Sequence, residues 1–383
     1  MKANFYRQQL QELMAMVEQK QGHQTEQIQT LPLSDYTNEE KWAAEKAMFK
    51  QLPLLVGHRS QLKSPGDFFV HEDLGPSLLI VRTQNNEVKA YYNYCQHRGS
   101  KLVHDSEGAG KKRFNCPYHA WSYDLEGKLA GVPREDLFPC LKREEKGLKE
   151  VYIEEKFGFL WVIQDPALGL TVADYFQGLE DDLAFLGAEN NAVYFNKTRS
   201  LKANWKLPLD AFLESYHIGV LHKDSVGEFF IKHVSYSEFI GPHIRSIVPR
   251  ENFGDLADQD WETANCRDYV SPTFILFPHT CFVLHPTSLS ILTLYPGDHP
   301  GESYWNHLLL VPEEPKTERQ IKHYEKTIKV LDGMTYEGED FWISEQIQQG
   351  LDHQGLTEIT LGLTEGVIGH FHRLVDEYAQ SKS

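Results

Sequence analysis

The chain has 383 residues, which leaves room for two domains of ordinary size. Its 55 acidic side chains outnumber its 38 basic ones and give a formal net charge of −17, which argues against a nucleic-acid partner because phosphate binding needs a basic surface. The sequence has no apolar run long enough to cross a membrane and begins with polar residues, so we expect a cytoplasmic protein without an anchor or signal peptide.

The first half of the chain changes from a helical to a strand pattern. Apolar residues at helical spacing predict a helix within residues 5–20, and a polar stretch follows it. From about residue 48 to residue 163, short strands alternate with turn signals; the clearest candidates are Leu78–Arg82, Val88–Tyr92 and 157–162. This region is predicted to form a small all-β domain.

Two cysteine and histidine pairs lie within the predicted β domain, Cys95 with His97 and Cys116 with His119. Two thiolates and two imidazoles suit either a tetrahedral zinc ion or a [2Fe-2S] cluster in which one iron takes the sulfur ligands and the other the nitrogen ligands. Residues 91–94 resemble a strand, and residues i and i+2 of an extended segment face the same side, so Cys95 and His97 can project together. The second pair is predicted to form a tight loop after a strand.

The second half of the chain mixes helix and strand signals, which favours an antiparallel sheet with helices. Helices are expected at 172–186 and 204–222, the latter despite Pro208. The expected strands are 274–277, 281–284, 289–294 and 307–311, and the expected later helices are 315–331, 340–351 and an amphipathic segment at 367–375. The fold class predicted for the whole chain is α+β.

A second group of candidate metal ligands lies in the 204–222 segment. His217 and His222 are five residues apart, about 140° around an ideal helix, so the helix must distort or end between them if both bind one ion. Two imidazoles and one carboxylate would leave open positions on iron(II) for dioxygen. Spacing does not choose the carboxylate among the late acids Asp332, Glu337, Glu339, Asp340, Glu345 and Asp352. Asp210 could accept a hydrogen bond from His222 or simply face water.

These motifs resemble those of the Rieske non-haem iron oxygenases, catalytic alpha subunits. The matching segments are Cys95-x-His97-Arg98-Gly99, Cys116-Pro117-Tyr118-His119-x-Trp121-x-Tyr123 and the hairpin at 124–129. The resemblance implies an N-terminal all-β Rieske [2Fe-2S] domain followed by a catalytic domain of antiparallel sheet and helices, of the helix-grip type. We expect residues 46–165 to form the Rieske domain and 166–383 the catalytic domain, with a helical segment at 1–45 packed on the latter. A structural zinc knuckle is the competing interpretation of the four ligands.

The resemblance also implies roles for three acids. Asp340-x-x-Ile343-x-Glu345 is similar to the family segment that supplies the third ligand of the mononuclear iron, which favours Asp340, with Glu339 as the second choice. In the family's trimers an acid three residues before the first iron histidine links it to a cluster histidine of the next subunit. That position is Glu214, where many relatives carry Asp, and it implies an electron path through His119 of one chain to Glu214 and His217 of its neighbour.

The function implied by the resemblance is that of an oxygenase of EC class 1.14 with one [2Fe-2S] cluster and one Fe(II) per subunit. It would activate O2 and hydroxylate an aromatic or other hydrophobic substrate, in a homotrimer. Electrons would come from NAD(P)H through a separate reductase, with or without a ferredoxin, since the chain has no Gly-x-Gly-x-x-Gly motif after a strand. Candidate substrate contacts are Phe212, Ile218 and His285.

Two other functions fit the same motifs. A Rieske monooxygenase that cleaves or demethylates a quaternary ammonium compound is one, because Glu214 in place of Asp also occurs in such relatives. Tyr216 or Trp305 could then supply cation–π contacts. A Rieske electron-transfer protein without oxygenase activity is the other, and it would lack the mononuclear iron.

Overall fold

The computed structural model describes residues 2–166 and 169–380 and divides into two units. The smaller unit consists of residues 50–176 and 187–192, and the larger unit contains the preceding residues, 177–186 and the chain from 193 onward. The domain bounds expected from the sequence stay a prediction. None of the helices in the described ranges is long and apolar enough to span a bilayer.

The smaller unit contains an antiparallel seven-stranded sheet and an antiparallel three-stranded sheet. The larger sheet has the order β2-β11-β10-β5-β4-β3-β6. Its strands are β2 (Leu54–His58), β3 (Phe68–His71), β4 (Leu78–Arg82), β5 (Val88–Tyr92), β6 (Glu107–Gly108), β10 (Glu150–Lys156) and β11 (Phe159–Ile163). The smaller sheet joins β7 (Phe114–Asn115), β8 (Ser122–Tyr123) and β9 (Leu129–Gly131). The all-β character and the bounds of β4 and β5 confirm the prediction from strand periodicity.

Strand β4 separates two apolar cores, because successive side chains of a strand point to opposite faces. Leu79 and Val81 belong to a cluster that also contains Cys95 and Cys116. Leu78 and Ile80 belong to a second cluster with residues of β2 and β11. The two thiols are therefore part of the apolar core of this unit, where water does not reach them.

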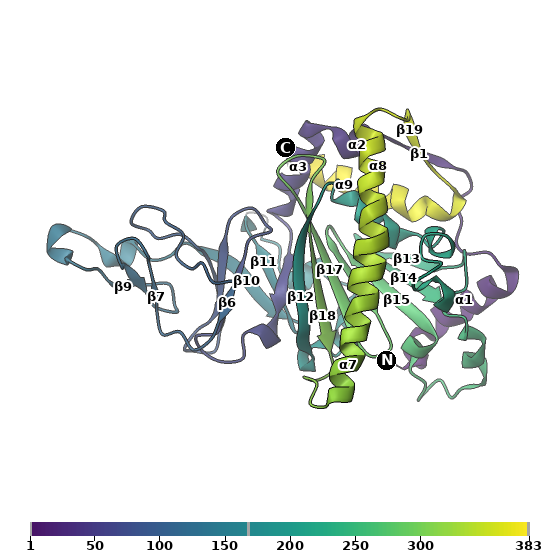
Figure 1. The fold of residues 1–383 in the computed structure, drawn as a ribbon, viewed down its shortest axis with the longest axis horizontal. Helices are drawn as coiled ribbons and strands as arrows, with labels where there is room; N and C mark the ends of the chain where they lie inside the picture. Colours follow the sequence, from purple (N-terminus) through teal and green to yellow (C-terminus); the bar gives the residue numbers. More distant parts are fainter. Residues whose placement is uncertain (1, 167–168, 381–383) are drawn as a thin grey trace. The chain divides into compact units, whose positions relative to one another are not determined.

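The larger unit is built on an antiparallel seven-stranded sheet with the order β12-β18-β17-β16-β15-β14-β13 (Figure 1). The strands are β12 (Ala192–Leu201), β13 (Tyr236–Ile240), β14 (His243–Pro249), β15 (Val270–Leu276), β16 (Thr280–Leu284), β17 (Leu289–Pro296) and β18 (Ser303–Val311). Strands β15 to β18 confirm the four apolar runs predicted to be strands. Every residue of β15 and β17 is buried, so both faces of the central sheet are covered.

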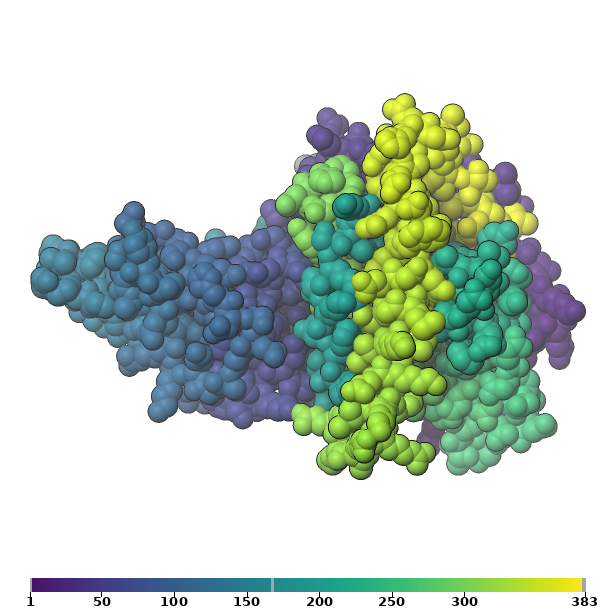
Figure 2. Space-filling model, in the orientation of Figure 1, coloured from purple at the N-terminus to yellow at the C-terminus, as the bar shows by residue number. Residues whose placement is uncertain are grey.

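One long helical rod crosses a face of this sheet. It consists of α7 (Glu318–Ile328), a π-helical segment (Lys329–Phe341) and α8 (Trp342–Asp352), and Figure 2 shows it along the surface of the larger unit. The two helices predicted at 315–331 and 340–351 are present as α7 and α8, but the chain between them, which was not predicted to be helical, is π-helical. π-helical segments are frequent at functional sites.

Shorter helices complete the larger unit. They include α1 (Arg7–Gln19), α2 (Ser34–Thr37), α3 (Glu39–Phe49), α5 (Glu180–Phe185), α6 (Lys206–Asp210) and α9 (Gly366–Gln380), and β1 (Gln29–Pro32) pairs with β19 (Glu358–Leu361). Helices α1 and α9 confirm the two terminal predictions. The expected helix at 172–186 is instead two short ones, α4 (Val172–Tyr175) and α5, separated at Gly178, whose φ of +90° no helix accepts.

The helix expected at 204–222 was largely wrong. Only α6 is α-helical, and a short 3-10 turn at Ala211–Leu213 ends at Glu214, which has an extended backbone (φ −143°, ψ 172°). A second 3-10 turn covers His217–Gly219. The break between α6 and this turn removes the 140° separation that a straight helix would impose on the two histidines.

Candidate metal centres and cavity

The two Cys-His pairs of the smaller unit lie in matched turns. In each turn the cysteine N–H donates to the carbonyl five residues later, Ser100 or Trp121, and the cysteine carbonyl accepts from the residue four positions on, Gly99 or Ala120. That fourth residue has a positive φ in both turns, +75° at Gly99 and +57° at Ala120. Strand β5 ends at Tyr92, so the expected extended path through Cys95 was wrong, whereas the tight loop after β7 is present.

The four side chains are graded from core to surface. The thiols of Cys95 and Cys116 are buried, His97 is half-buried and His119 is exposed. The imidazole rings approach to 4.7 Å between centroids, and Trp121 stacks on His97 at 4.8 Å with an interplanar angle of 13°. A group held here would have its sulfur-bound end in the core and its nitrogen-bound end near solvent.

The chemistry of this site fits a two-iron group better than one zinc ion. A tetrahedral zinc ion needs donor atoms roughly 3–4 Å apart. Among the described residues, one group of three or more His, Cys, Asp and Glu side chains has donor atoms within 4.8 Å of one another, and it does not include these four. Burial raises the pKa of the Cys95 thiol, and a hydrogen bond from Tyr123, 3.3 Å from the sulfur, acts in the opposite direction. A hydrogen bond to sulfur is one way in which a protein tunes the potential of an iron-sulfur group.

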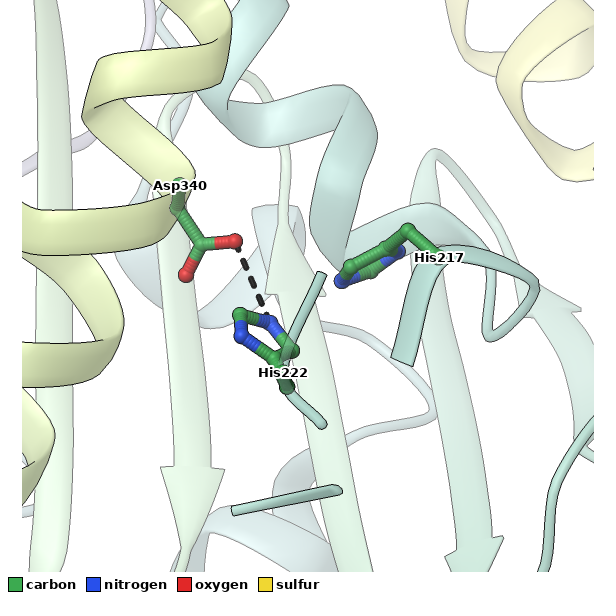
Figure 3. Close-up of side chains that lie close together, drawn as sticks. All are labelled: His217, His222 and Asp340. Atoms are coloured by element: carbon green, nitrogen blue, oxygen red, sulfur yellow. Dashed lines mark ion pairs between the residues drawn. The ribbon is translucent and has the colours of Figure 1, made fainter. Parts of the chain in front are cut away.

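The group with converging donor atoms is His217, His222 and Asp340 in the larger unit. His222 and Asp340 are buried, and His217 is half-buried. The Nε2 atom of His222 lies 3.3 Å from Oδ1 of Asp340, the two imidazole rings are 5.0 Å apart, and all three side chains turn toward one space (Figure 3). Apart from this contact with His222, Oδ1 of Asp340 is buried without a hydrogen-bond partner among the described residues. A buried carboxylate oxygen beside two imidazoles fits a divalent iron.

Two further carboxylates contact the Nδ1 atoms of the two imidazoles. Glu214 accepts from Nδ1 of His217 and from the backbone N–H groups of Tyr216 and His217. Glu339 lies 2.7 Å from Nδ1 of His222 and also accepts from Ser225. Such carboxylates fix the ring orientation and leave Nε2 free for a metal. Burial would lower the pKa of His222, but Asp340 and Glu339 outweigh burial and raise it.

Asp210 has neither of the two environments considered for it. It is buried rather than facing water, and its carboxylate accepts from Tyr36 at 2.8 Å and contacts Nε2 of His372 at 3.2 Å. The partner of His222 is Glu339 instead. Asp210 is the last residue of α6, and its two contacts lie in α2 and in the C-terminal helix α9.

A cavity of about 440 Å³ opens beside the His217, His222 and Asp340 group. The three predicted substrate contacts, Phe212, Ile218 and His285, all line it. Its other lining side chains are partly apolar and partly polar, and the phenyl and phenol rings of Phe229, Phe230 and Tyr336 are among them. Tyr216 is 60% exposed and Trp305 is fully buried, and neither lines the cavity, so the cation–π contacts considered for them were placed wrongly.

Two functional candidates were missed by sequence reasoning. Glu339 was predicted only as an alternative metal ligand, whereas it contacts Nδ1 of His222. Helix geometry could have indicated this, because neighbouring residues in a helix point about 100° apart, so Glu339 and Asp340 cannot point in the same direction. Arg250 lines the cavity from the end of β14, and its place after a buried strand gave no signal.

Comparison with known proteins gives matches over both units. Residues 188–381 match the family of ring hydroxylating alpha subunits (catalytic domain), and residues 53–142 match the Rieske [2Fe-2S] domain. A carnitine monooxygenase oxygenase subunit of Escherichia coli (strain K12) is 27% identical over 368 residues, which cover 90% of this chain and 92% of that protein. A biphenyl 2,3-dioxygenase subunit alpha of Rhodococcus jostii (strain RHA1) is 30% identical, over 48% of this chain and 41% of its own length.

Among solved structures, a quaternary ammonium Rieske monooxygenase in complex with L-carnitine has a similar fold. It covers 92% of this chain and 96% of its own, with a TM-score of 0.78 and 23% sequence identity. At 23% sequence identity, this structural similarity is evidence for the fold only.

Proposed function

Since this chain belongs to the ring hydroxylating oxygenase alpha subunits of the Rieske type, we propose that it oxidises a quaternary ammonium compound as a monooxygenase. Its class is that of a Rieske oxygenase, EC 1.14, and the family implies a [2Fe-2S] cluster and a mononuclear iron. The aromatic substrate expected first is supported less well. Carnitine monooxygenase oxygenase subunits align along nearly the whole chain, whereas the matching segment of the biphenyl dioxygenase covers about half of it.

The observation that carries this proposal is the cavity at the His217, His222 and Asp340 group. Aromatic rings bind quaternary ammonium groups through the negative face of the ring, and Phe212, Phe229 and Tyr336 supply such rings here. A trimethylammonium group has no N–H to donate, and its methyl groups suit the apolar side chains of the cavity wall.

The metal ligands that we propose follow the two groups of side chains. Cys95, Cys116, His97 and His119 would hold the cluster, and His217, His222 and Asp340 the iron. When bound, the two centres supply the stored electron and the dioxygen activation that no side chain can provide. Glu214 and Glu339 orient the imidazoles, and the apolar wall excludes water from the substrate carbon. Glu214 would also connect to His119 of a neighbouring subunit in a homotrimer.

The proposed reaction consumes O2, two electrons and two protons and yields water and a substrate hydroxylated on a carbon next to nitrogen. The hydroxylated carbon then loses the amine: the C–N bond breaks, nitrogen keeps its electron pair, and the hydroxyl becomes an aldehyde as its proton leaves. The oxygenase subunit implies a separate reductase, and we propose NAD(P)H as its electron source, with or without a ferredoxin.

The test is a product screen with a compatible reductase, labelled dioxygen, a panel of methylated amines and a panel of aromatic acids. We expect one amine and one labelled aldehyde for each NAD(P)H and O2 consumed with a quaternary ammonium substrate. A labelled diol from an aromatic acid, with no amine released from any ammonium compound, would contradict the proposal and restore the aromatic alternative.

A further inference from the structure

Arg250 is a half-buried cation that lines the cavity and forms no ion pair with another described residue. It follows β14 and lines the cavity, and its Nε atom is buried without a hydrogen-bond partner among the described residues. Its guanidinium lies over the ring of Phe230, 5.3 Å from the centroid. Asp268 is near enough to favour its charge, but no ion pair within 4.0 Å joins the two in the described ranges. Burial lowers the pKa of Arg250 from its ordinary value.

Two other arginines of this unit, Arg245 and Arg267, are partnered. Arg245 contacts Asp182 at 2.6 Å and also pairs with Glu238. Arg267 donates from Nε to the carbonyl of His285 at 2.5 Å. A buried guanidinium without an acceptor is costly, because its lost hydration is not replaced. Arg199 also has unpartnered nitrogens, but its Nη2 pairs with Asp332, whereas no ion pair to Arg250 is present among the described residues.

No other interior cation competes with Arg250 within the described lining. Burial is the main cause that lowers the pKa of His285 to about 3, so its imidazole is neutral, and its Nε2 lies 2.9 Å from the hydroxyl of Ser290. Lys326 lines the cavity too, but it is exposed. The cavity lining thus offers one planar guanidinium, together with the Glu214 and Asp340 carboxylates.

We propose that Arg250 binds a carboxylate of the substrate, so that the quaternary ammonium compound oxidised here is a zwitterion. This inference rests on the proposed function and narrows its substrate class. A guanidinium matches a carboxylate with two parallel N–H···O bonds, and such a pair is stronger than a neutral hydrogen bond when water is excluded. Anchoring the carboxylate would fix which carbon lies beside the metal ligands.

Four small molecules of similar shape test the contributions of the ammonium charge and the carboxylate charge separately. They are 4-(trimethylammonio)butanoate, its amide, 5,5-dimethylhexanoate, in which carbon replaces nitrogen, and the amide of that acid. Calorimetry with the metal-loaded enzyme compares wild type with Arg250→Met, Arg250→Lys and the rim control Lys326→Met. Cluster absorption and iron content verify that each variant is folded and loaded.

We expect Arg250→Met to weaken binding of both carboxylates about tenfold or more and binding of both amides less than about threefold. Arg250→Lys should recover part of the loss, since lysine keeps the charge but not the fork. Lys326→Met should change each affinity less than about threefold. Equal losses for acids and amides, or a carboxylate-specific loss in Lys326→Met, would overturn the assignment.

The same probes distinguish a failure of the substrate class from a failure of this inference. If the wild type binds 5,5-dimethylhexanoate as tightly as its trimethylammonium counterpart, the ammonium site fails while Arg250 remains testable with the acid. If Arg250→Met is not recovered folded, the wild type decides: it must prefer each acid to its amide about tenfold or more, and equal affinities overturn the carboxylate site.

Discussion

The two proposed metal sites differ in how the sequence encodes them. The Cys95–His119 site comes from two short turns with the same backbone hydrogen-bond pattern, so each turn carries its own geometry. The His217, His222 and Asp340 site takes its ligands from a broken helix and a π-helical segment more than a hundred residues later, and its geometry depends on the packing of both. We therefore expect loss of a ligand to empty either site, and substitution of the carboxylates that support the second site to have graded effects.

The largest effect is expected at a cluster thiol. Cys116→Ser should abolish the visible absorption of the cluster and all turnover, because serine supplies no soft thiolate to iron. Cys140→Ser is the matched control, since Cys140 is an exposed free cysteine of the same unit and should keep both. Absorption spectra and sulfide analysis make the comparison, and a cluster that survives in Cys116→Ser would rule out this ligand.

Glu214→Gln should keep both metals and lower turnover about 100-fold or more. An amide still accepts one hydrogen bond in the 214–217 turn but loses the charge that we propose connects subunits. Glu365→Gln is the control, because burial first and the charge of Glu214 next raise the pKa of Glu365, which places a similar carboxyl nearby. Oxygen consumption with iron analysis checks both, and normal consumption in Glu214→Gln would exclude the bridging role.

Glu339→Gln tests whether a carboxylate that contacts a metal ligand, but not the metal, affects iron binding. Its Oε2 lies 2.7 Å from Nδ1 of His222, so the amide should weaken iron affinity about 10–100-fold and leave the cluster spectrum unchanged. Titration of the metal-depleted protein with Fe(II) measures the affinity. Complete loss of iron at saturating Fe(II) would make Glu339 a ligand, contrary to the present assignment.

The smallest effect is expected from Asp210→Asn, on stability rather than iron. The variant should lower the free energy of unfolding by about 1–3 kcal/mol, since Asp210 contacts Tyr36 and His372 in the core. Burial alone would lower the pKa of His372, but Asp210 outweighs it and raises the pKa above 6.5. This stabilisation is present below the ordinary pKa and lost as pH rises through the raised one, so the loss should be larger near about pH 6 than near about pH 9.

Denaturant unfolding at the two pH values measures this difference. An iron content below that of the wild type in Asp210→Asn would show that Asp210 does support the metal site. A difference in stability that is larger at the higher pH would contradict the linkage to His372.

The same contrast explains what could be predicted from sequence. The strands β4, β5 and β15 to β18 follow from local periodicity, and the Cys and His pairs from contiguous motifs. The backbone at Cys95 and the break after α6 could not be predicted, because both depend on turns that side-chain periodicity does not report. The partner of Asp210 lies 162 residues away in sequence, and the unpaired state of Arg250 depends on which acids fail to reach it. Long-range packing decides both.

The most direct test of two separate metal sites is the iron and acid-labile sulfide content of the wild type beside Asp340→Ala. We expect about three irons and two sulfides per chain in the wild type, and about two of each in the variant with an unchanged cluster spectrum. A variant that keeps the third iron, or loses sulfide together with it, would contradict the separation of the two centres.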